Sequence, residues 1–590
     1  MKEPGSTAER RRIRPDAYLL LLLGFASILF LLHAPYARLP YFWDEMGQFV
    51  PAALDIANSG AWVPRSTVPN VHPPAVMAYL ALVWKTAGYS IAATRVAMLA
   101  LASLGALFAF LLAIELCRPL RGAPAFAAVL LLIASPLFYT QAMMAQLDMP
   151  AMVFTLAALL LFLQRRYAVC AAVCTLLVLV KETGLVAPAL FLVWLVFREK
   201  RLREACYFVA PFAALAIWLV ILKRATGYWL GDAGFTHYNV FYSLEPVRVI
   251  AALVRRIYYL FFAEFRWIGT IAIVLAWRGG VRPDRSQGTT TPLRSWLGKG
   301  LSWAGNVWRG RIGNESSVFN TREWAITGLF CAAHVLLVSL FGGATLERYL
   351  LPVLPIVYIA AAAAWTLYTP GWRLTSALGL AAGLVASLFW NSPYPVPLEN
   401  NLAMVDFVHV QQAAAQFLDA HMPGATVASA WPFTQALADP RFGYVHRPFH
   451  TVETTDFRRS NVMAVNPSKV DALAVYARTW TPSWSVLRSR VVTEFLHRYY
   501  DYEPQIPGKE IELWLGFQPA ARWERRGQWI ELYVKPSAER VHFQHRPGGI
   551  SSPEGSASWN RSRESKPDLR ASGRVAVLAA RGEFPANGRR

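Results

Sequence analysis

The sequence predicts an α-helical protein that crosses a membrane many times and carries a smaller α/β domain at its C-terminal end. Hydrophobic residues make up 55% of the 590 residues and charged residues only 16%, whereas soluble domains average roughly 25% charged residues. Stretches such as 17–33 are long and almost free of charge, and about 20 apolar residues are enough to cross a bilayer. After about residue 393 the composition becomes polar and short strand-like runs follow, which indicates a separate domain outside the membrane.

We expect about eleven membrane-spanning segments. Their approximate bounds are 17–33, 92–116, 124–139, 149–163, 167–181, 184–197, 205–222, 257–277, 324–341, 350–367 and 374–390. Basic residues gather between alternate spans, at 118–121, 165–166, 198–203 and 278–322. Because cytoplasmic loops carry the excess of lysine and arginine, these clusters and the basic N-terminus are predicted in the cytoplasm. An odd number of spans then places the C-terminal domain on the extracytoplasmic, or periplasmic, side of the inner (cell) membrane.

Three extracytoplasmic segments follow from this topology, at 34–91, about 140–148 and about 223–256. The first contains AVMAYLALVWKTAGY, which is apolar but too short to span, so we expect a helix that lies on the membrane surface. The cytoplasmic loop 278–323 is long and places tryptophans among arginines and lysines. This pattern is typical of an amphipathic helix on anionic headgroups.

The chain divides into a transmembrane domain (1–392), an extracytoplasmic α/β domain (393–540) and a tail (541–590). In the second part, VDFVHVQQAAAQFLDAHM has helical periodicity, whereas ATVASA, KEIELWLG and QWIELYVK are strand-like. It shows neither a Gly-rich phosphate loop nor a nucleophile motif. The tail is rich in Gly, Ser, Arg and Pro and is predicted to be disordered.

The net charge of +21 would ordinarily suggest nucleic acid as a partner. Here the excess lies largely in the short loops assigned to the cytoplasm, and membrane orientation accounts for it, so no nucleic-acid partner is predicted. The five cysteines lie in or beside hydrophobic stretches and form neither a disulfide framework nor a zinc-site pattern. We expect no metal and no cofactor.

The acidic pair Asp44 and Glu45 directly follows the first span, in YFWDEMGQF, and is therefore predicted on the outer face. An isolated acidic pair is usually a solvated loop, but the residues that follow favour a functional site. They comprise an alanine-rich helical stretch, Gly60 and Trp62, the turn His72-Pro73-Pro74, and the apolar helix that ends near Lys85.

This ordered set resembles the class C glycosyltransferases, in particular the group around the protein O-mannosyltransferases and the lipid A aminoarabinose transferases. Two weaker similarities are VLVKETGLVAP, which contains Lys181, and ERYLLPVLP, which contains Arg348. The resemblance covers roughly residues 16–392. It implies an inverting membrane enzyme that transfers a sugar from a polyprenyl-phosphate or dolichyl-phosphate donor to a lipid, glycan or protein acceptor on the outer face, without a metal.

The resemblance also implies roles for residues. Asp44 matches the general base, which must accept a proton from the attacking acceptor. Glu45 is expected to orient Asp44 or to shape its titration. The lipid phosphate that leaves needs cations or hydrogen-bond donors. The candidates are Lys85, Lys181, Arg348 and the adjacent Tyr349.

Each cation also has a structural interpretation. Lys85 can simply extend from a surface helix towards water, Lys181 can pair with the adjacent Glu182, and the neighbouring Glu347 can neutralise Arg348. Ionisable residues at membrane depth are functional by default, which favours Lys181.

Two further candidates are assigned to substrate binding. Asp148, in QLDMP, is either a second carboxylate of the site or the N-cap of a helix before Pro150. His72 stands where the family often has a basic residue, so it either contacts acceptor or phosphate or is a turn histidine without a role.

Two other functions were weighed. A secondary transporter would show internal repeats and ionisable groups at the bilayer midplane within broken helices, and neither is convincing here. A membrane scaffold that binds envelope glycans through its C-terminal domain, without catalysis, is the other alternative.

Overall fold

The computed structural model describes residues 15–118, 120, 124–279, 319, 321–390, 399–478 and 485–536. The predicted disordered tail lies outside these residues, and so does the predicted amphipathic helix of the long basic loop, apart from the ends of that loop.

The described residues between 15 and 390 fold into a bundle of helices. These are α1 (Pro15–His33), α2 (Val50–Ser59), α3 (Ala75–Ala87), α4 (Ile91–Leu116), α5 (Pro124–Ala134), α6 (Pro136–Gln141), α7 (Asp148–Leu163), α8 (Tyr167–Val180), α9 (Val186–Val193), α10 (Leu202–Ala205), α11 (Val209–Thr226), α12 (Ala233–Thr236), α13 (Pro246–Phe261), α14 (Trp267–Gly279), α16 (Arg322–Leu340), α17 (Leu354–Trp365) and α18 (Pro370–Phe389). Short helical turns connect several of them.

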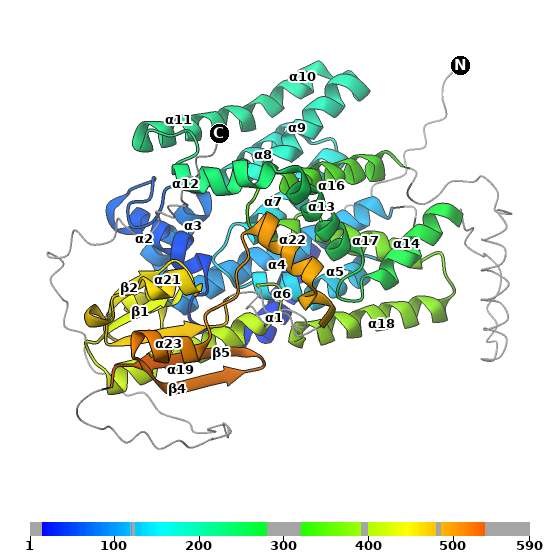
Figure 1. The fold of residues 1–590 in the computed structure, drawn as a ribbon. Helices are drawn as coiled ribbons and strands as arrows, with labels where there is room; N and C mark the ends of the chain where they lie inside the picture. Colours follow the sequence, from blue (N-terminus) through cyan, green and yellow to red (C-terminus); the bar gives the residue numbers. More distant parts are fainter. Residues whose placement is uncertain are drawn as a thin grey trace, which may run out of the picture.

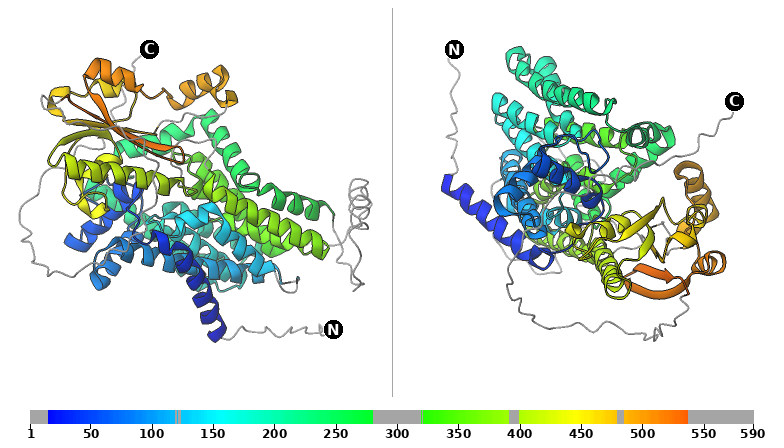
Figure 2. Two further views of the ribbon diagram at one scale, coloured as in Figure 1. Left: turned by 90° about the horizontal axis from the view of Figure 1, so that it is seen from below. Right: turned by 90° about the vertical axis from the view of Figure 1, so that its left-hand side faces the viewer.

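An α/β region follows and sits against one end of the bundle (Figure 1, Figure 2). Its elements are α19 (Ala403–His421), β1 (Thr426–Ala430), α20 (Phe433–Ala438), β2 (His450–Thr454), α21 (Arg459–Met463), β3 (Ala472–Tyr476), α22 (Arg490–Tyr500), α23 (Gly508–Leu515), β4 (Gln518–Arg525) and β5 (Gln528–Val534).

The sheet has the order β2-β1-β3-β5-β4. Strand β1 is parallel to both β2 and β3, whereas β5 is antiparallel to β3 and to β4. All five residues of β3 are buried, as expected for a central strand, and α19 packs against β4 and β5. Both faces of the sheet are therefore covered at its centre, and α19 covers the part that β4 and β5 form.

Five helical segments are long and apolar enough to cross a membrane: Asp16–Tyr36, Ile91–Leu116, Leu202–Thr226, Arg322–Leu340 and Pro370–Phe389. Shorter apolar helices lie at most of the other predicted spans. The predicted fold class, a helical membrane domain followed by an α/β region, is confirmed. The sequence AVMAYLALVWKTAGY forms the separate helix α3, as expected.

Two predictions are wrong. The span predicted at 257–277 is two helices, α13 and α14, because the backbone turns at Glu264 and Phe265, which both have positive φ. The strand predicted for KEIELWLG is helix α23. Alternating apolar residues suggested a strand, but Ile511 alone is buried in that helix, and the helix stops at Gly516 in the left-handed conformation, a common helix end.

Different connecting segments meet at the two ends of the bundle. At one end the three predicted outer segments meet: the Asp232 amide donates to the carbonyl of Pro69 (2.9 Å), and the Ala145 amide donates to the carboxylate of Glu45 (2.6 Å). At the other end, Trp324 Nε1 at the start of α16 donates to the carbonyl of Leu116 at the end of α4 (3.2 Å). The predicted grouping of loops is thus seen in the fold, while the side of the membrane that each end faces stays a prediction.

Candidate active site

A single arginine gathers three carboxylates at the end where the outer segments meet. The guanidinium of Arg348 contacts Asp44 through Nη2, Glu399 through Nη1 and Asp148 through Nε, the last at 3.2 Å. Arg348 is 5% exposed, Asp148 4% and Glu399 10%, whereas Asp44 is 15% exposed. Asp44 is therefore the carboxylate of the cluster that solvent and a substrate reach most easily.

The three carboxylates come from distant parts of the chain. Asp44 lies in the first outer segment, Asp148 is the first residue of α7, and Glu399 follows α18. Arg348 belongs to a short helical turn, Glu347–Leu350, between α16 and α17. The chain after α18 is fixed from a second side, because Thr140 Oγ1 donates to the carbonyl of Glu399 (2.6 Å).

A second cation completes the cluster. Lys181 Nζ donates to Asp148 Oδ1 (2.5 Å) and lies 4.2 Å from the centre of the Tyr349 ring. Lys181 sits at the break between α8 and the short turn Glu182–Leu185, with an extended backbone that ends the helix. Its side chain is 7% exposed. The structure therefore brings Lys181, Arg348, Tyr349, Asp44 and Asp148 together, and their roles in catalysis and binding stay a prediction.

The loop that carries Asp44 is held in an unusual backbone conformation. Trp43 has φ +45°, which is uncommon for a residue with a bulky side chain. The Trp43 ring packs edge-on against Trp431 of the sheet region, with 4.9 Å between ring centres. A Cβ atom on Gly47 would lie 2.7 Å from the Trp431 side chain, so only glycine allows this close approach. The α/β region thus supports the loop from outside.

Glu45 points away from Asp44 into the protein. Its carboxylate is fully buried and pairs with Arg95 of α4, which is itself 1% exposed. The same carboxylate accepts hydrogen bonds from the backbone amides of Phe42 (2.9 Å) and Ala145 (2.6 Å). Arg95 in turn donates to the Met143 carbonyl (2.9 Å). These contacts tie the first outer segment to α4 and to the turn before α7. The expected role of orienting Asp44 stays a prediction, and positioning of the whole loop is the role these contacts support.

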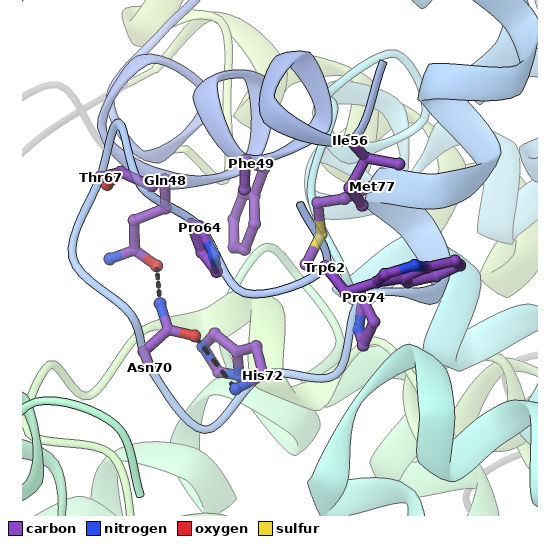
Figure 3. A pocket seen from close by; sticks show the side chains of 11 residues that line it. Gln48, Phe49, Ile56, Trp62, Pro64, Thr67, Asn70, His72, Pro74 and Met77 are labelled. Atoms are coloured by element: carbon purple, nitrogen blue, oxygen red, sulfur yellow. Dashed lines mark hydrogen bonds between the residues drawn. The ribbon is translucent and has the colours of Figure 1, made fainter. Parts of the chain in front are cut away.

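His72 lies beside the cluster. Its Nδ1 is 2.9 Å from Glu182 Oε2, next to Lys181 in the chain. Figure 3 shows the hydrogen-bonded series Gln48–Asn70–His72 on the wall of a narrow pocket. Phe49, Trp62 and Met77 are among its other lining residues. The cavity volume of about 10 Å³ holds roughly one water molecule, so this pocket admits a sugar only if the loop moves.

Lys85 is not part of this arrangement. It is exposed near the C-terminal end of α3 and forms no ion pair with any residue that the structure describes. Its predicted contact with a donor phosphate stays a prediction, and the contacts give it no support.

Three residues of the site were missed by sequence analysis. Glu399 lies in a stretch interpreted as a proline-rich linker, and nothing local distinguishes it. Arg95 and Arg256 carried a signal, because a charged residue inside a predicted span or at its edge usually has a partner. Arg256 donates to the Val338 carbonyl (2.6 Å) and lies 5.7 Å from the Tyr349 ring centre, which places a further cation behind that ring.

The electrostatics of Glu399 are unusual. Burial raises the pKa of its carboxyl to about 7 from an ordinary value of 4.5, although the Arg348 guanidinium favours the ionised form. Asp44 and Asp148 raise this pKa further through like charge. Near neutral pH the cluster therefore exchanges a proton at Glu399. Among the described residues, no group of three or more His, Cys, Asp or Glu side chains is arranged to hold a metal ion.

No protein-family profile and no curated protein matches the chain. Several solved structures match over most of it. ArnT from Cupriavidus metallidurans, bound to undecaprenyl phosphate, is 14% identical, with 88% of this chain and 98% of that chain covered and a TM-score of 0.45. The archaeal oligosaccharyltransferase AglB from Archaeoglobus fulgidus, in complex with an inhibitory peptide and a dolichol-phosphate, is 13% identical, with 78% and 69% covered and a TM-score of 0.43.

The arabinofuranosyltransferase AftD from mycobacteria is 14% identical, with 89% of this chain but 40% of that chain covered and a TM-score of 0.39. All three are class C glycosyltransferases, the family that the motifs of the sequence resemble.

We expect Arg95→Met to destabilise the protein strongly. The substitution leaves the buried carboxylate of Glu45 without its cation, which typically costs about 3–5 kcal/mol. Thermal unfolding of the detergent-purified protein measures the effect, with Lys85→Met as the control that removes an exposed charge. The double variant Arg95→Met/Glu45→Met should recover part of the loss. Equal unfolding temperatures of Arg95→Met and Lys85→Met would contradict the positioning role.

We also expect Glu399 to make stability depend on pH. Because its folded pKa lies above the unfolded one, folding takes up a proton between about pH 4.5 and pH 7, and the free energy of unfolding falls as the pH rises through this window. The upper limit of the effect is about 3 kcal/mol. Glu399→Gln should flatten this decline in unfolding temperature, while the exposed control Glu494→Gln should keep it. Identical slopes in both variants would refute the assignment.

Proposed function

We propose that this protein is a membrane glycosyltransferase that moves a sugar from a polyprenyl-phosphate donor to an acceptor on the extracytoplasmic face. The observation that carries the proposal is the juxtaposition of an accessible carboxylate, Asp44, with two buried cations, Arg348 and Lys181, at the end of a helical membrane domain. Sugar transfer from a lipid phosphate needs both groups, a base for the acceptor and cations for the leaving phosphate.

Asp44 is the proposed general base. One of its oxygens, Oδ2, contacts Arg348, and Oδ1 forms no hydrogen bond within the described part of the chain. An acceptor hydroxyl or amine that hydrogen-bonds to Oδ1 gives up its proton there while its oxygen or nitrogen bonds to the anomeric carbon. The bond from that carbon to the phosphate oxygen breaks in the same step, and the electron pair stays on the lipid phosphate. A single displacement of this kind inverts the anomeric configuration.

Arg348 and Lys181 are the proposed binding groups for the donor phosphate. Guanidinium–phosphate and ammonium–phosphate contacts are among the strongest hydrogen bonds in proteins. Both cations contact carboxylates in this structure, so a donor phosphate must displace at least one of these carboxylates. Tyr349 packs against Lys181 and limits where its ammonium group can move. The ArnT structure is described as bound to undecaprenyl phosphate, which is the donor lipid class that we propose here.

The narrow pocket with His72 is the proposed path to the acceptor side. Gln48 and Phe49, a few residues after Asp44, line it, and the contact of His72 with Glu182 connects it to the neighbouring residue Lys181. Binding of a lipid, a glycan or a protein to this pocket and to the neighbouring α/β region would identify the class of acceptor.

Asp44→Asn should abolish transfer while leaving membrane insertion intact. Loss of a general base lowers rates by about 100- to 10,000-fold, and the amide keeps the shape of the side chain. Mass spectrometry of envelope lipids, polysaccharides and glycoproteins would be compared between cells complemented with the wild type and with this variant, at equal membrane levels. Asp439→Asn, which removes a carboxylate paired with Arg441 at the surface, is the control. A sugar-sized product that persists in the Asp44→Asn strain would overturn the proposed base.

Lys181→Gln should weaken binding of a polyprenyl phosphate on the order of ten-fold, because one charge-assisted contact is lost. Retention of undecaprenyl phosphate by the purified protein, followed by native mass spectrometry, measures this directly. Lys85→Gln makes the same chemical change at the exposed lysine of α3 and should leave retention unchanged. Weaker retention in Lys85→Gln than in Lys181→Gln would instead place the donor phosphate at the surface helix α3.

A further inference from the structure

A second basic pocket lies at the other end of the bundle, away from the Arg348 cluster. It is a cavity of about 580 Å³, within the range of about 300–1,000 Å³ that is typical of small-molecule sites. Its lining residues are Arg165, Trp194, Arg198, Glu199, Arg201, Thr321, Arg322 and Ala325. Four arginines and one glutamate give this wall a formal charge of +3.

The position of the pocket follows from the helices that reach it. Helix α7 begins at Asp148, in the proposed active site, and Arg165 follows its last turn. Its 16 residues correspond to a length of about 24 Å. Helix α16 begins at Arg322 in the pocket and ends at Leu340, shortly before Arg348. The two basic sites are therefore separated by most of the thickness of a bilayer core, roughly 30 Å.

Glu199 organises the arginines. Its carboxylate accepts hydrogen bonds from Arg322 Nε (2.7 Å) and from Trp194 Nε1 (2.8 Å), and it lies 3.7 Å from Arg201 Nε. Arg165 and Arg198 line the same pocket and are exposed, so a ligand in the pocket can reach their guanidinium groups. One carboxylate holds two arginines in place while two more remain available to an anion.

The surroundings of the pocket are apolar and exposed. Phe197 is 75% exposed and Leu202 is 63% exposed, and both flank the arginine segment 198–201. Exposed apolar side chains beside arginines, with a tryptophan at the boundary, are typical of a membrane interface. Basic pockets between membrane helices commonly bind phosphate headgroups.

We infer that this pocket binds the phosphate headgroup of an anionic membrane lipid, in the leaflet opposite to the proposed active site. The arginines take the phosphate, which their planar guanidinium groups recognise by paired hydrogen bonds. The acyl chains lie along the exposed apolar side chains. This site is independent of sugar transfer, and it fixes the ends of α7, α9 and α16 relative to one another.

The experiment compares two double variants of the full-length protein in a neutral detergent. Arg165→Gln/Arg198→Gln removes two arginines that line the pocket. Arg166→Gln/Arg203→Gln removes two exposed arginines that neighbour pocket residues in sequence but do not line it. Both variants lose the same charge, and thermal unfolding without added lipid should be similar because exposed substitutions have small effects.

Native mass spectrometry with phosphatidylglycerol and phosphatidylcholine then measures lipid retention. We expect the wild type and Arg166→Gln/Arg203→Gln to retain phosphatidylglycerol in preference to phosphatidylcholine. Arg165→Gln/Arg198→Gln should bind phosphatidylglycerol about 10- to 30-fold more weakly, because two guanidinium contacts with the lipid phosphate are lost.

Two outcomes would overturn the inference. An equal loss of phosphatidylglycerol in both double variants would mean that general positive charge, and not the pocket, attracts the lipid. Displacement of phosphatidylglycerol by inorganic phosphate at equal concentration would mean that a soluble phosphate compound, and not a lipid, occupies the pocket.

Discussion

The ion-pair cluster around Arg348 is the interaction on which the rest of the site depends. Carboxylates that leave water at the end of an apolar helical bundle are costly unless a cation compensates them. One guanidinium serves three carboxylates here, from the first outer segment, the start of α7 and the chain after α18. The side chains proposed for catalysis and binding are therefore also the ones whose ion pairs hold these distant parts of the chain together. This arrangement explains how loops more than 300 residues apart in sequence, such as those of Asp44 and Arg348, come to one place.

The adjacent acids Asp44 and Glu45 show how neighbouring residues divide two tasks. Glu45 is fully buried against Arg95 and backbone amides, so the loop has one rigid attachment to α4. Trp43 turns the backbone through a positive φ and packs on Trp431 of the α/β region. Between these two attachments Asp44 faces the cluster with a partly exposed side chain. The side chain proposed as the base is thereby held in a fixed position, which proximity effects in catalysis require.

Much of this could be predicted from the sequence, and what could not has a physical reason. Charge-free runs and basic loops predicted the helical domain, because the bilayer imposes both patterns. Asp44, Lys181 and Arg348 were found because they lie in motifs that resemble those of class C glycosyltransferases. Glu399 could not be found, since nothing in its own neighbourhood specifies that it shares Arg348 across 51 residues of chain. The helix α23 was predicted as a strand because a run of only eight residues is compatible with both the strand period of two and the helical period of 3.6. Such a short run is assigned only by the packing that it finds in the fold.

The charge of the cluster limits how a donor can bind. Asp44, Asp148 and Glu399 together carry three negative charges when ionised, against two positive charges on the cations that contact them, Arg348 and Lys181. A lipid phosphate that enters this set adds further negative charge, so it is opposed unless one carboxylate becomes neutral. Burial raises the pKa of Glu399 to about 7, so this carboxyl accepts a proton near neutral pH with little cost. In the proposed reaction, protonation of Glu399 frees one side of Arg348 for the donor phosphate, on the side of the guanidinium away from its contact with Asp44. Glu399, one of the residues that sequence analysis missed, is therefore the carboxyl group that makes this cluster of acids compatible with the proposed anionic donor.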